Sequence, residues 1–461
     1  MKRLSPYLPA AGIFCLALIV RIIYNLTVGR GYTPLYDSSV YQEIALNLLR
    51  ARCFCQDANI PITGRAPFWP AVIAVIYDLL GPKNIYVRLF LACIGSGTCV
   101  LIYLFARDIF GRRIGLVAGI IAVIYPNLFI YDGWLYSESL YTFLLFAFCY
   151  TLFLVQRTSQ ARWMLISGIL AGLVSLTRPN GVIIPVFVIA WAVVIAWQKV
   201  LSWRVAASAA LIVAGLMIAM VGPWTLRNYS IARQFIPVAT GDGTVLLGAY
   251  NHLILDPGPY QYLWIRPTLA NPQLAQAYLG RNCQSYCETQ RDAAYKAAAS
   301  QWIDSHLSDM PLLLAMHVVK MWTPATPEGD LPMNQFPTRL SSQAVMDMIN
   351  ILSYPLFILA AFGLLATRRK WRELLFIYGM IGLTFAECIY YYGSSRFRAP
   401  IEPMLVLLAA GAIWWLSAQD DGTLRWLLSK RKQRGEKTTP NREQQPISEN
   451  NTVMKALGGN P

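Results

Sequence analysis

Acidic side chains occur at two places where the chain changes from apolar to polar. Asp37 lies in a Tyr-Asp-Ser-Ser-Val-Tyr stretch that directly follows the first apolar run, and Glu138 ends the stretch 131–138, which contains no Lys or Arg. An unpaired carboxylate beside a lipid bilayer is costly. We therefore expect these carboxylates to lie at one depth and to share a functional site.

Arginines occur at the ends of several other apolar runs. Five of them fall on the side predicted below to face away from the cytoplasm: Arg65, Arg178, Arg227, Arg396 and Arg398. Anchoring of helix ends to headgroup phosphates explains one or two such residues easily, but not five. Because a guanidinium presents a fixed fork of donors to phosphate oxygens, arginines beside a carboxylate indicate a membrane-borne phosphate ester as substrate. Arg21, inside the first run, is expected to pair with an acid in a neighbouring helix.

Membrane helices must position these side chains. The 461-residue chain is 56% hydrophobic and 14% charged, with a mean hydropathy of +0.43, so it has too few charges to cover a soluble globule of this size. Apolar runs of about 16 to 20 residues recur, a length at which a helix crosses a bilayer core. We predict an all-α polytopic membrane protein with about ten transmembrane helices, near residues 10–28, 86–106, 114–131, 139–156, 163–177, 182–198, 205–223, 350–367, 373–391 and 400–418.

Basic residues predict the orientation. The Lys and Arg residues behind the net charge of +15 lie in short clusters between the runs and in the C-terminal tail, which indicates membrane topology and no nucleic-acid partner. With about ten spans these clusters all fall on one side, which places the chain in the inner (plasma) membrane with both termini cytoplasmic. The run 10–28 is followed by no small-residue cleavage motif, so it is interpreted as the first span and not as a signal peptide.

Two longer segments, 29–84 and 224–349, then lie on the periplasmic side. Within them, 66–80 and 311–322 are predicted to be interfacial helices, 291–307 a helix and 324–337 a Pro-rich loop. The domain organisation predicted is an N-terminal core over 1–223 that includes the first periplasmic loop, a periplasmic region over 224–349, C-terminal helices over 350–418 and a basic, disordered cytoplasmic tail over 419–461.

Four of the nine cysteines lie in the two periplasmic segments: Cys53, Cys55, Cys283 and Cys287. On the oxidising side of a membrane, disulfides are the natural interpretation. A bond between Cys53 and Cys55 would be strained at that separation, so we predict pairing between the two segments. A zinc site built from the four thiolates has the right number of ligands and stays as an alternative. The three histidines show no metal-binding spacing.

Six short motifs, in this order, resemble those of the GT-C glycosyltransferases, specifically the bacterial relatives of dolichyl-phosphate-mannose protein mannosyltransferases (family 39) and of the lipid A aminoarabinose transferase. Individually each motif is weak, but the order is fairly specific, and the resemblance covers about residues 10–418. The motifs are Asp37 after the first span, Arg-Ala-Pro-x-x-Pro at 65–70, Ser-Glu-Ser-Leu at 137–140, Thr-Arg-Pro-x-Gly at 177–181, Pro-Trp-x-x-Arg-Asn at 223–228 and Arg-Phe-Arg-x-Pro-x-x-Pro at 396–403.

The resemblance implies a GT-C fold and the inverting transfer of one sugar from a polyprenyl-phosphate donor to a hydroxyl of a lipid, glycan or protein acceptor at the periplasmic face. Asp37 is then the general base, and the leaving phosphate is stabilised first by Arg65 and Arg227, then by Arg396, with Arg398 and Arg178 beside them. Tyr41 and Trp224 would line the substrate cavity. Glu138 would act either as a second carboxylate or, with Asp37, as a ligand of a divalent cation. The eukaryotic enzymes carry Asp-Glu where this chain has Asp37 and Ser38.

Two other classes of protein remain as alternatives. A transporter or flippase of a lipid-linked or anionic substrate also has many spans and a few buried charges, but its ionisable residues lie near the bilayer midplane and its halves often repeat. Here the charges collect at outer helix ends, and no repeat is visible. The second is a glycan ligase or polymerase that uses pyrophosphate-linked oligosaccharides, and only the order of the motifs argues against it.

Overall fold

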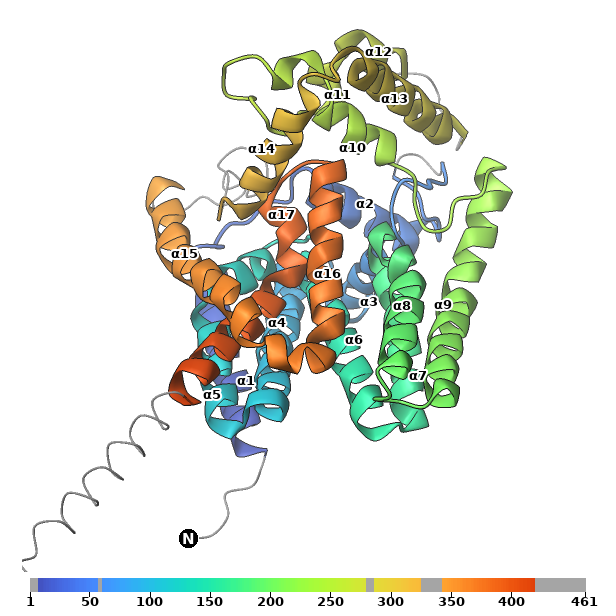
Figure 1. Cartoon of the computed structure of the whole chain (residues 1–461). Helices are drawn as coiled ribbons and strands as arrows, with labels where there is room; N and C mark the ends of the chain where they lie inside the picture. Colours follow the sequence, from blue (N-terminus) through green and yellow to red (C-terminus); the bar gives the residue numbers. More distant parts are fainter. Residues whose placement is uncertain (1–6, 57–59, 279–285, 325–341, 419–461) are drawn as a thin grey trace, which may run out of the picture. The chain divides into compact units, whose positions relative to one another are not determined.

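Helices account for almost all regular structure in the chain. The computed structural model describes residues 7–56, 60–278, 286–324 and 342–418 (Figure 1), and within these ranges the only β pairing is an isolated bridge between Cys55 and Pro61. The all-α prediction is confirmed. The predicted loop after Pro324 and the tail beyond residue 418 lie outside the described residues.

Eight helical segments of the described chain are long and apolar enough to cross a membrane. They are Leu8–Leu26 (α1), Asn84–Phe110 (α4), Glu138–Thr158 (α6), Pro179–Trp197 (η3 and α8), Trp203–Ala232 (α9), Asp347–Ala366 (within α15, Ser342–Ala366), Arg368–Tyr390 (η6 and α16, Trp371–Tyr390) and Ser395–Ala418 (α17, η7 and a final helix). The two remaining predicted spans form shorter helices, α5 (Arg112–Ile124) and α7 (Ala161–Thr177). The multi-pass architecture is thus confirmed.

Two of the predicted spans end at other residues than expected, both near a proline. The span predicted over 114–131 ends at Ile124, because Pro126 forces the residue before it into an extended conformation and two 3₁₀ turns follow, η1 (Pro126–Leu128) and η2 (Ile130–Gly133). Conversely, α9 does not end at Pro223 but continues to Ala232. Gly222 carries no Cβ that would meet the proline ring, and membrane helices tolerate such a proline.

Short helices form where interfacial helices were predicted. α3 (Phe68–Leu80) and α14 (Met310–Trp322) have 13 residues each, fewer than a span needs. The helix predicted over 291–307 is α13 (Tyr286–Ser305), and α2 (Asp37–Arg50) is an additional helix in the segment 29–84.

The helices pack as two groups that matter for the site. α4 packs against α1, α5 and α6, while α7 packs against α6 and α9 and α8 lies beside α9 (Figure 1). α10 (Asp242–Ala249) packs against α13 and α11 (Pro267–Ala270), around a separate apolar cluster that includes Leu246, Tyr295 and Leu313. This second group is formed entirely by the segment between α9 and α15 and by tyrosines at the end of α16.

A buried ion pair links the first span to the turn before α6. Arg21 of α1 donates from Nε to Asp132 Oδ2 at 2.7 Å and from Nη2 to the carbonyl of Leu128 at 3.0 Å, and both charged side chains are fully buried. Gly95 of α4 faces the pair, and a Cβ there would collide with Asp132 and Arg21. The predicted pairing of Arg21 with an acid from a neighbouring element is confirmed.

Removing one partner of this pair should destabilise the fold. We expect Arg21→Met to lower the free energy of unfolding by about 3–5 kcal/mol, because it leaves the Asp132 carboxylate buried without its counter-charge. The double variant Arg21→Met/Asp132→Leu should recover most of that loss. Thermal unfolding in detergent measures both, with exposed Arg30→Met as the control. Equal melting temperatures for Arg21→Met and Arg30→Met would contradict a structural role for the pair.

Candidate active site

Asp37 is the first residue of α2, and the chain enters this helix through a strained residue. Tyr36 has φ of 54°, a region that side chains other than glycine seldom occupy, and the guanidinium of Arg266 lies 4.3 Å from the centroid of its ring. A carboxylate at a helix N-terminus is stabilised by the helix dipole. The strained entry thus places an ionised group at the start of α2.

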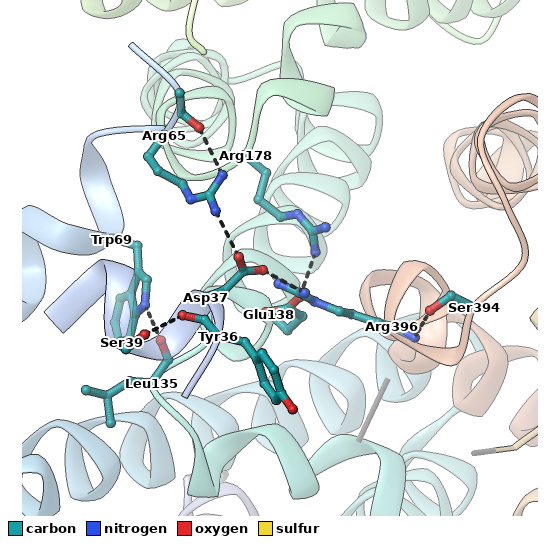
Figure 2. Close-up of polar contacts among 11 residues, drawn as sticks. Tyr36, Asp37, Ser39, Arg65, Trp69, Leu135, Glu138, Arg178, Ser394 and Arg396 are labelled. Atoms are coloured by element: carbon teal, nitrogen blue, oxygen red, sulfur yellow. Dashed lines mark hydrogen bonds and ion pairs between the residues drawn. The ribbon is translucent and has the colours of Figure 1, made fainter. Parts of the chain in front are cut away.

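Five charged side chains alternate in sign around Asp37 (Figure 2). Arg65 Nη2 lies 2.9 Å from Asp37 Oδ1, and Arg396 Nη1 lies 2.8 Å from Asp37 Oδ2. Arg396 also donates from Nε to Glu138 Oε1, to which Arg178 donates at 3.3 Å. The order in space is therefore Arg65, Asp37, Arg396, Glu138, Arg178. We call these five residues the charge cluster.

Each member of the charge cluster comes from the end of a different element. Arg65 precedes α3, Glu138 begins α6, Arg178 follows the last residue of α7, and Arg396 lies in α17 (Ser395–Arg398), whose N-cap Ser394 accepts a hydrogen bond from the Arg396 backbone. The predicted site residues Asp37, Glu138, Arg65, Arg178 and Arg396 are thus brought together by the structure.

Backbone contacts fix the segment that leads into Glu138. Trp69 of α3 donates from its indole nitrogen to the carbonyl of Leu135 at 3.0 Å, and the amide of Leu135 donates to the hydroxyl of Tyr32 at 3.1 Å. The Arg396 guanidinium lies 4.5 Å from the ring centroid of Tyr136. These contacts fix the position of the segment that precedes Glu138.

Solvent access decreases from Arg65 to Glu138 and rises again to 16% at Arg178. The side chains of Arg65 and Asp37 are 35% and 29% exposed, that of Arg396 is 20% exposed, and that of Glu138 is fully buried. Tyr41, one turn after Asp37 on α2, has its pKa raised by burial and by the charge of Asp37. A soluble or membrane-borne reactant can therefore reach Asp37 and Arg65, whereas Glu138 is reached only through the arginines.

The surroundings keep Asp37 ionised. Burial by itself raises the pKa of a carboxyl group, but the positive charges of Arg396 and Arg65 outweigh it and lower the pKa of Asp37 to about 2. Conversely, the pKa of Arg65 is raised by the charge of Asp37 in spite of burial. With three arginines and two carboxylates the charge cluster has a net charge of +1.

A divalent cation does not fit Asp37 and Glu138 as arranged. Both oxygens of Asp37 and Oε1 of Glu138 are engaged by arginines, and Glu138 Oε2 is the one carboxylate oxygen of this pair without a hydrogen-bond partner. Among the described residues, no three His, Cys, Asp or Glu side chains gather as a ligand set. A cation would also add to a site that is already positive, so the arrangement suits an anion.

Arg398, predicted to bind phosphate, is placed elsewhere. Its fully buried guanidinium donates to Glu402 at 2.7 Å, to the carbonyls of Thr323 and Pro324 at 3.0 Å each, and to the carbonyl of Met321. It fastens the end of α14 to α17. Because its donors are occupied by carbonyls, it is not part of the charge cluster.

Arg227 and Trp224 also bind backbone carbonyls and do not contact the charge cluster. Arg227 donates to the carbonyls of Ile62 and Phe54, and its guanidinium lies 4.6 Å from the Trp224 ring centroid. Trp224 donates to the carbonyl of Val238 at 2.8 Å. The structure therefore places Arg227 against the backbone of the segment that precedes Arg65, with Trp224 packed beside it.

A small pocket adjoins Arg178. Its polar end has Arg178, Asn180 and Glu387, and its remaining lining is largely apolar: Tyr141, Leu145, Ile184, Met380, Leu383, Thr384, Phe397 and Pro400. Sequence reasoning missed Glu387. The signal was available, because a carboxylate inside an apolar run is itself an indication of function.

The cysteine pairing differs from the prediction. Cys53 is bonded to Cys55, whereas Cys287 is a free thiol and Cys283 lies outside the described residues. The prediction of pairing between the two periplasmic segments is wrong for Cys53 and Cys55. The two Cα atoms lie 5.2 Å apart, within the usual range for a disulfide.

The fold resembles that of solved GT-C glycosyltransferases. The archaeal oligosaccharyltransferase AglB from Archaeoglobus fulgidus, in complex with an inhibitory peptide and a dolichol-phosphate, is similar over 92% of this chain with a TM-score of 0.55 and 14% identity, and its apo form over 94% with a TM-score of 0.54 and 13% identity. This chain spans about half the length of those proteins, 52% and 53%. ArnT from Cupriavidus metallidurans bound to undecaprenyl phosphate aligns over 90% of this chain and 80% of its own, with 14% identity and a TM-score of 0.40.

Sequence comparison points to the same class. Residues 64–224 match the family model described as dolichyl-phosphate-mannose-protein mannosyltransferase. No curated protein sequence matches the chain. The chain thus resembles the GT-C glycosyltransferases, as its motifs predicted, and the matched third of the sequence contains Arg65, Glu138 and Arg178.

The two arginines beside Asp37 should differ in their effect on stability. Arg396→Met is expected to lower the free energy of unfolding by about 3 kcal/mol, because it leaves the buried Glu138 with Arg178 alone. Arg65→Met should cost no more than about 1 kcal/mol, since Arg65 is one-third exposed. Thermal unfolding in detergent compares the two, and an equal loss would argue against Arg396 as the central member of the charge cluster.

The loss of stability at low pH should include a contribution from the protonation of Asp37. Because its pKa is lowered on folding, its ion pairs contribute stability that is complete above the unfolded pKa of about 3.9 and is lost as the pH falls toward about 2. We expect the difference in melting temperature between the wild type and Asp37→Asn to be constant from about pH 8 to 5 and to shrink below about pH 4. A difference that already shrinks near pH 6 would contradict the lowered pKa.

Proposed function

We propose that this chain is an inverting glycosyltransferase of the inner membrane. It moves a single hexosyl or pentosyl group from a polyprenyl-phosphate donor to a hydroxyl of a lipid, glycan or protein acceptor at the periplasmic face. The observation that carries the proposal is the charge cluster: an accessible carboxylate between two arginines, with one excess positive charge. The basic clusters between the spans support a cytoplasmic position for both termini.

The net charge favours one class of donor. A phosphodiester that joins a sugar to a polyprenol has one negative charge, which matches the net charge of +1 of the charge cluster. A pyrophosphate-linked donor has two negative charges and would leave the site negative without an added cation. Charge balance at close range in a partly buried site is worth several kcal/mol, so it discriminates between the two.

The chemistry follows from the positions of Asp37 and its arginines. Donor phosphate at Arg65 and Arg396 replaces Asp37 as their partner, which leaves the Asp37 carboxylate available to an acceptor hydroxyl. Asp37 takes the hydroxyl proton while the acceptor oxygen forms a bond to the anomeric carbon on the face opposite the phosphate. The bond between the anomeric carbon and the phosphate oxygen breaks, and the arginines stabilise the charge on the leaving polyprenyl phosphate.

The lining of the pocket beside Arg178 supports the proposal that the substrate is amphiphilic. Arg178 and Asn180 lie at its polar end, while Leu145, Met380 and Leu383 line the part formed by α6 and α16. A lipid phosphate has the same division into an anionic head and an apolar chain. The similar fold of AglB, whose complex contains a dolichol-phosphate, is consistent with such a substrate.

Sugar transfer by Asp37 variants tests the proposal. Purified protein in proteoliposomes is supplied with undecaprenyl-phosphate-linked sugars and a membrane lipid extract as acceptor, and labelled product is measured. Asp37→Asn should reduce turnover by about 10²- to 10⁴-fold, because general-base catalysis is lost. Glu373→Gln is the matched control, since Glu373 lies in the first turn of α16 in an exposed pair with Lys370.

Other outcomes identify the alternatives. Turnover of Asp37→Asn equal to that of the control would remove Asp37 as the base. Transfer from pyrophosphate-linked donors and not from monophosphate-linked ones would favour a glycan ligase or polymerase. Movement of the labelled lipid between leaflets without sugar transfer would indicate a transporter or flippase.

A further inference from the structure

One face of α13 carries charged residues that all bind other parts of the chain. Glu288, Asp292 and Lys296 are spaced four residues apart, so they lie on the same side of the helix. Together they contact the segment before Arg65 and the start of α10. None of the three belongs to the charge cluster.

Glu288 holds the residue two positions before Arg65. Its Oε2 accepts hydrogen bonds from the backbone amide of Thr63 at 2.6 Å and from the Thr63 hydroxyl at 2.9 Å, across a separation of 225 residues. Thr63 is fully buried. Gly64 leaves space for the carboxylate, because a Cβ at that position would lie 3.0 Å from Glu288 Oε1.

The same short segment is held from its other sides as well. The carbonyl of Thr63 accepts from the amide of Thr240 at 3.0 Å, and the carbonyl of Ile62 accepts from Arg227. Residues 62–65 have no helix or strand of their own. Their conformation therefore depends on these contacts, and with it the position from which Arg65 reaches Asp37.

Asp292, one turn further along the same face, is connected through α10 and Tyr391 to the segment that carries Arg396. Asp292 Oδ1 accepts from the amides of Gly241 and Gly243 at 3.1 and 2.7 Å, which fixes the start of α10. Asp242, the first residue of α10, accepts a hydrogen bond from the hydroxyl of Tyr391 at 3.3 Å. The Tyr391 ring stacks on Phe397 with an interplanar angle of 6°, directly after Arg396.

We propose that Glu288 is a positioning residue for the transfer reaction and acts through Thr63 on Arg65, while Asp292 on the same helix supports the segment of Arg396. α13 thereby sets the separation of the two arginines on either side of Asp37. This inference rests on the proposed function, in which both arginines bind the donor phosphate. Displacement of a phosphate-binding side chain by about 1 Å can reduce turnover about 100-fold, so a contact outside the site can control the rate.

Kinetics of Glu288 variants separate positioning from folding. Glu288→Gln should lower kcat/KM for an undecaprenyl-phosphate-linked donor by about 10- to 100-fold, because the neutral amide holds the Thr63 donors more weakly than the carboxylate. Glu288→Asp keeps the negative charge and should therefore lose less of the donor kcat/KM than Glu288→Gln. The KM for the acceptor should not change, and the melting temperature should stay close to that of Glu373→Gln, the control.

A double-variant cycle tests the route through Arg65. In an Arg65→Ala background, Glu288→Gln should have no further effect on donor kcat/KM, because the side chain that it positions is absent. Additive losses would overturn the route. Unchanged donor kinetics of Glu288→Gln, with active wild type, would overturn the positioning role and leave the proposed function intact, whereas an inactive wild type would overturn both.

Hydrogen exchange tests the contact without any substrate. In the full-length protein, the amide of Thr63 should exchange at least 10-fold faster in Glu288→Gln than in the wild type or in Glu373→Gln, since its acceptor is weakened. Faster exchange supports the hold of α13 on this segment. An unchanged rate at Thr63 would overturn the inference whatever the kinetics show.

Discussion

The structure around the site depends on the neutralisation of one buried carboxylate. Glu138 begins α6 with its side chain fully buried, and an isolated charge there would be prohibitively costly. Arg178 at the end of α7 and Arg396 in α17 supply the counter-charges. α6 and α7 follow one another in the chain, whereas α17 lies more than 200 residues later, so the pairing requires three helix ends to meet at one level. Arg396 has a second partner in Asp37, so the level of the accessible acid is set by the buried one.

Residues at the ends of apolar runs were predictable because run length fixes depth. A helix that crosses a bilayer must end near a surface, so Asp37, Glu138 and the arginines could be placed at one level from the sequence alone. The pairing of Arg21 followed from the cost of an unpaired charge inside a span. The order of motifs gave the GT-C resemblance that the fold and the family model bear out. Depth, charge and order thus sufficed for the architecture and for the five residues that form the charge cluster.

Depth alone could not tell which arginines face Asp37. Arg227 and Arg398 have the same residue type and the same predicted level, yet they bind carbonyls of irregular segments, at Ile62 and at Thr323. Such carbonyls have no partner within a helix, and a buried guanidinium satisfies several of them at once. The sequence does not reveal where these carbonyls lie, because their positions depend on how the long segments 29–84 and 224–349 fold. The bond between Cys53 and Cys55 was rejected because of their short separation in the sequence, yet their Cα atoms lie 5.2 Å apart, within the usual range for a disulfide.

The alternation of charge also explains why a positive site can hold a reactive carboxylate. Arg65 and Arg178 end the charge cluster, so the excess positive charge lies at its two ends, where an anion can approach without first meeting a carboxylate. Asp37 between two arginines is a weak base, as its lowered pKa requires. An anion that engages Arg65 or Arg396 weakens the hold of that arginine on Asp37 and raises the basicity of the carboxylate. In the proposed reaction, the two arginines that lower the basicity of Asp37 therefore make its proton affinity depend on the anion that they bind.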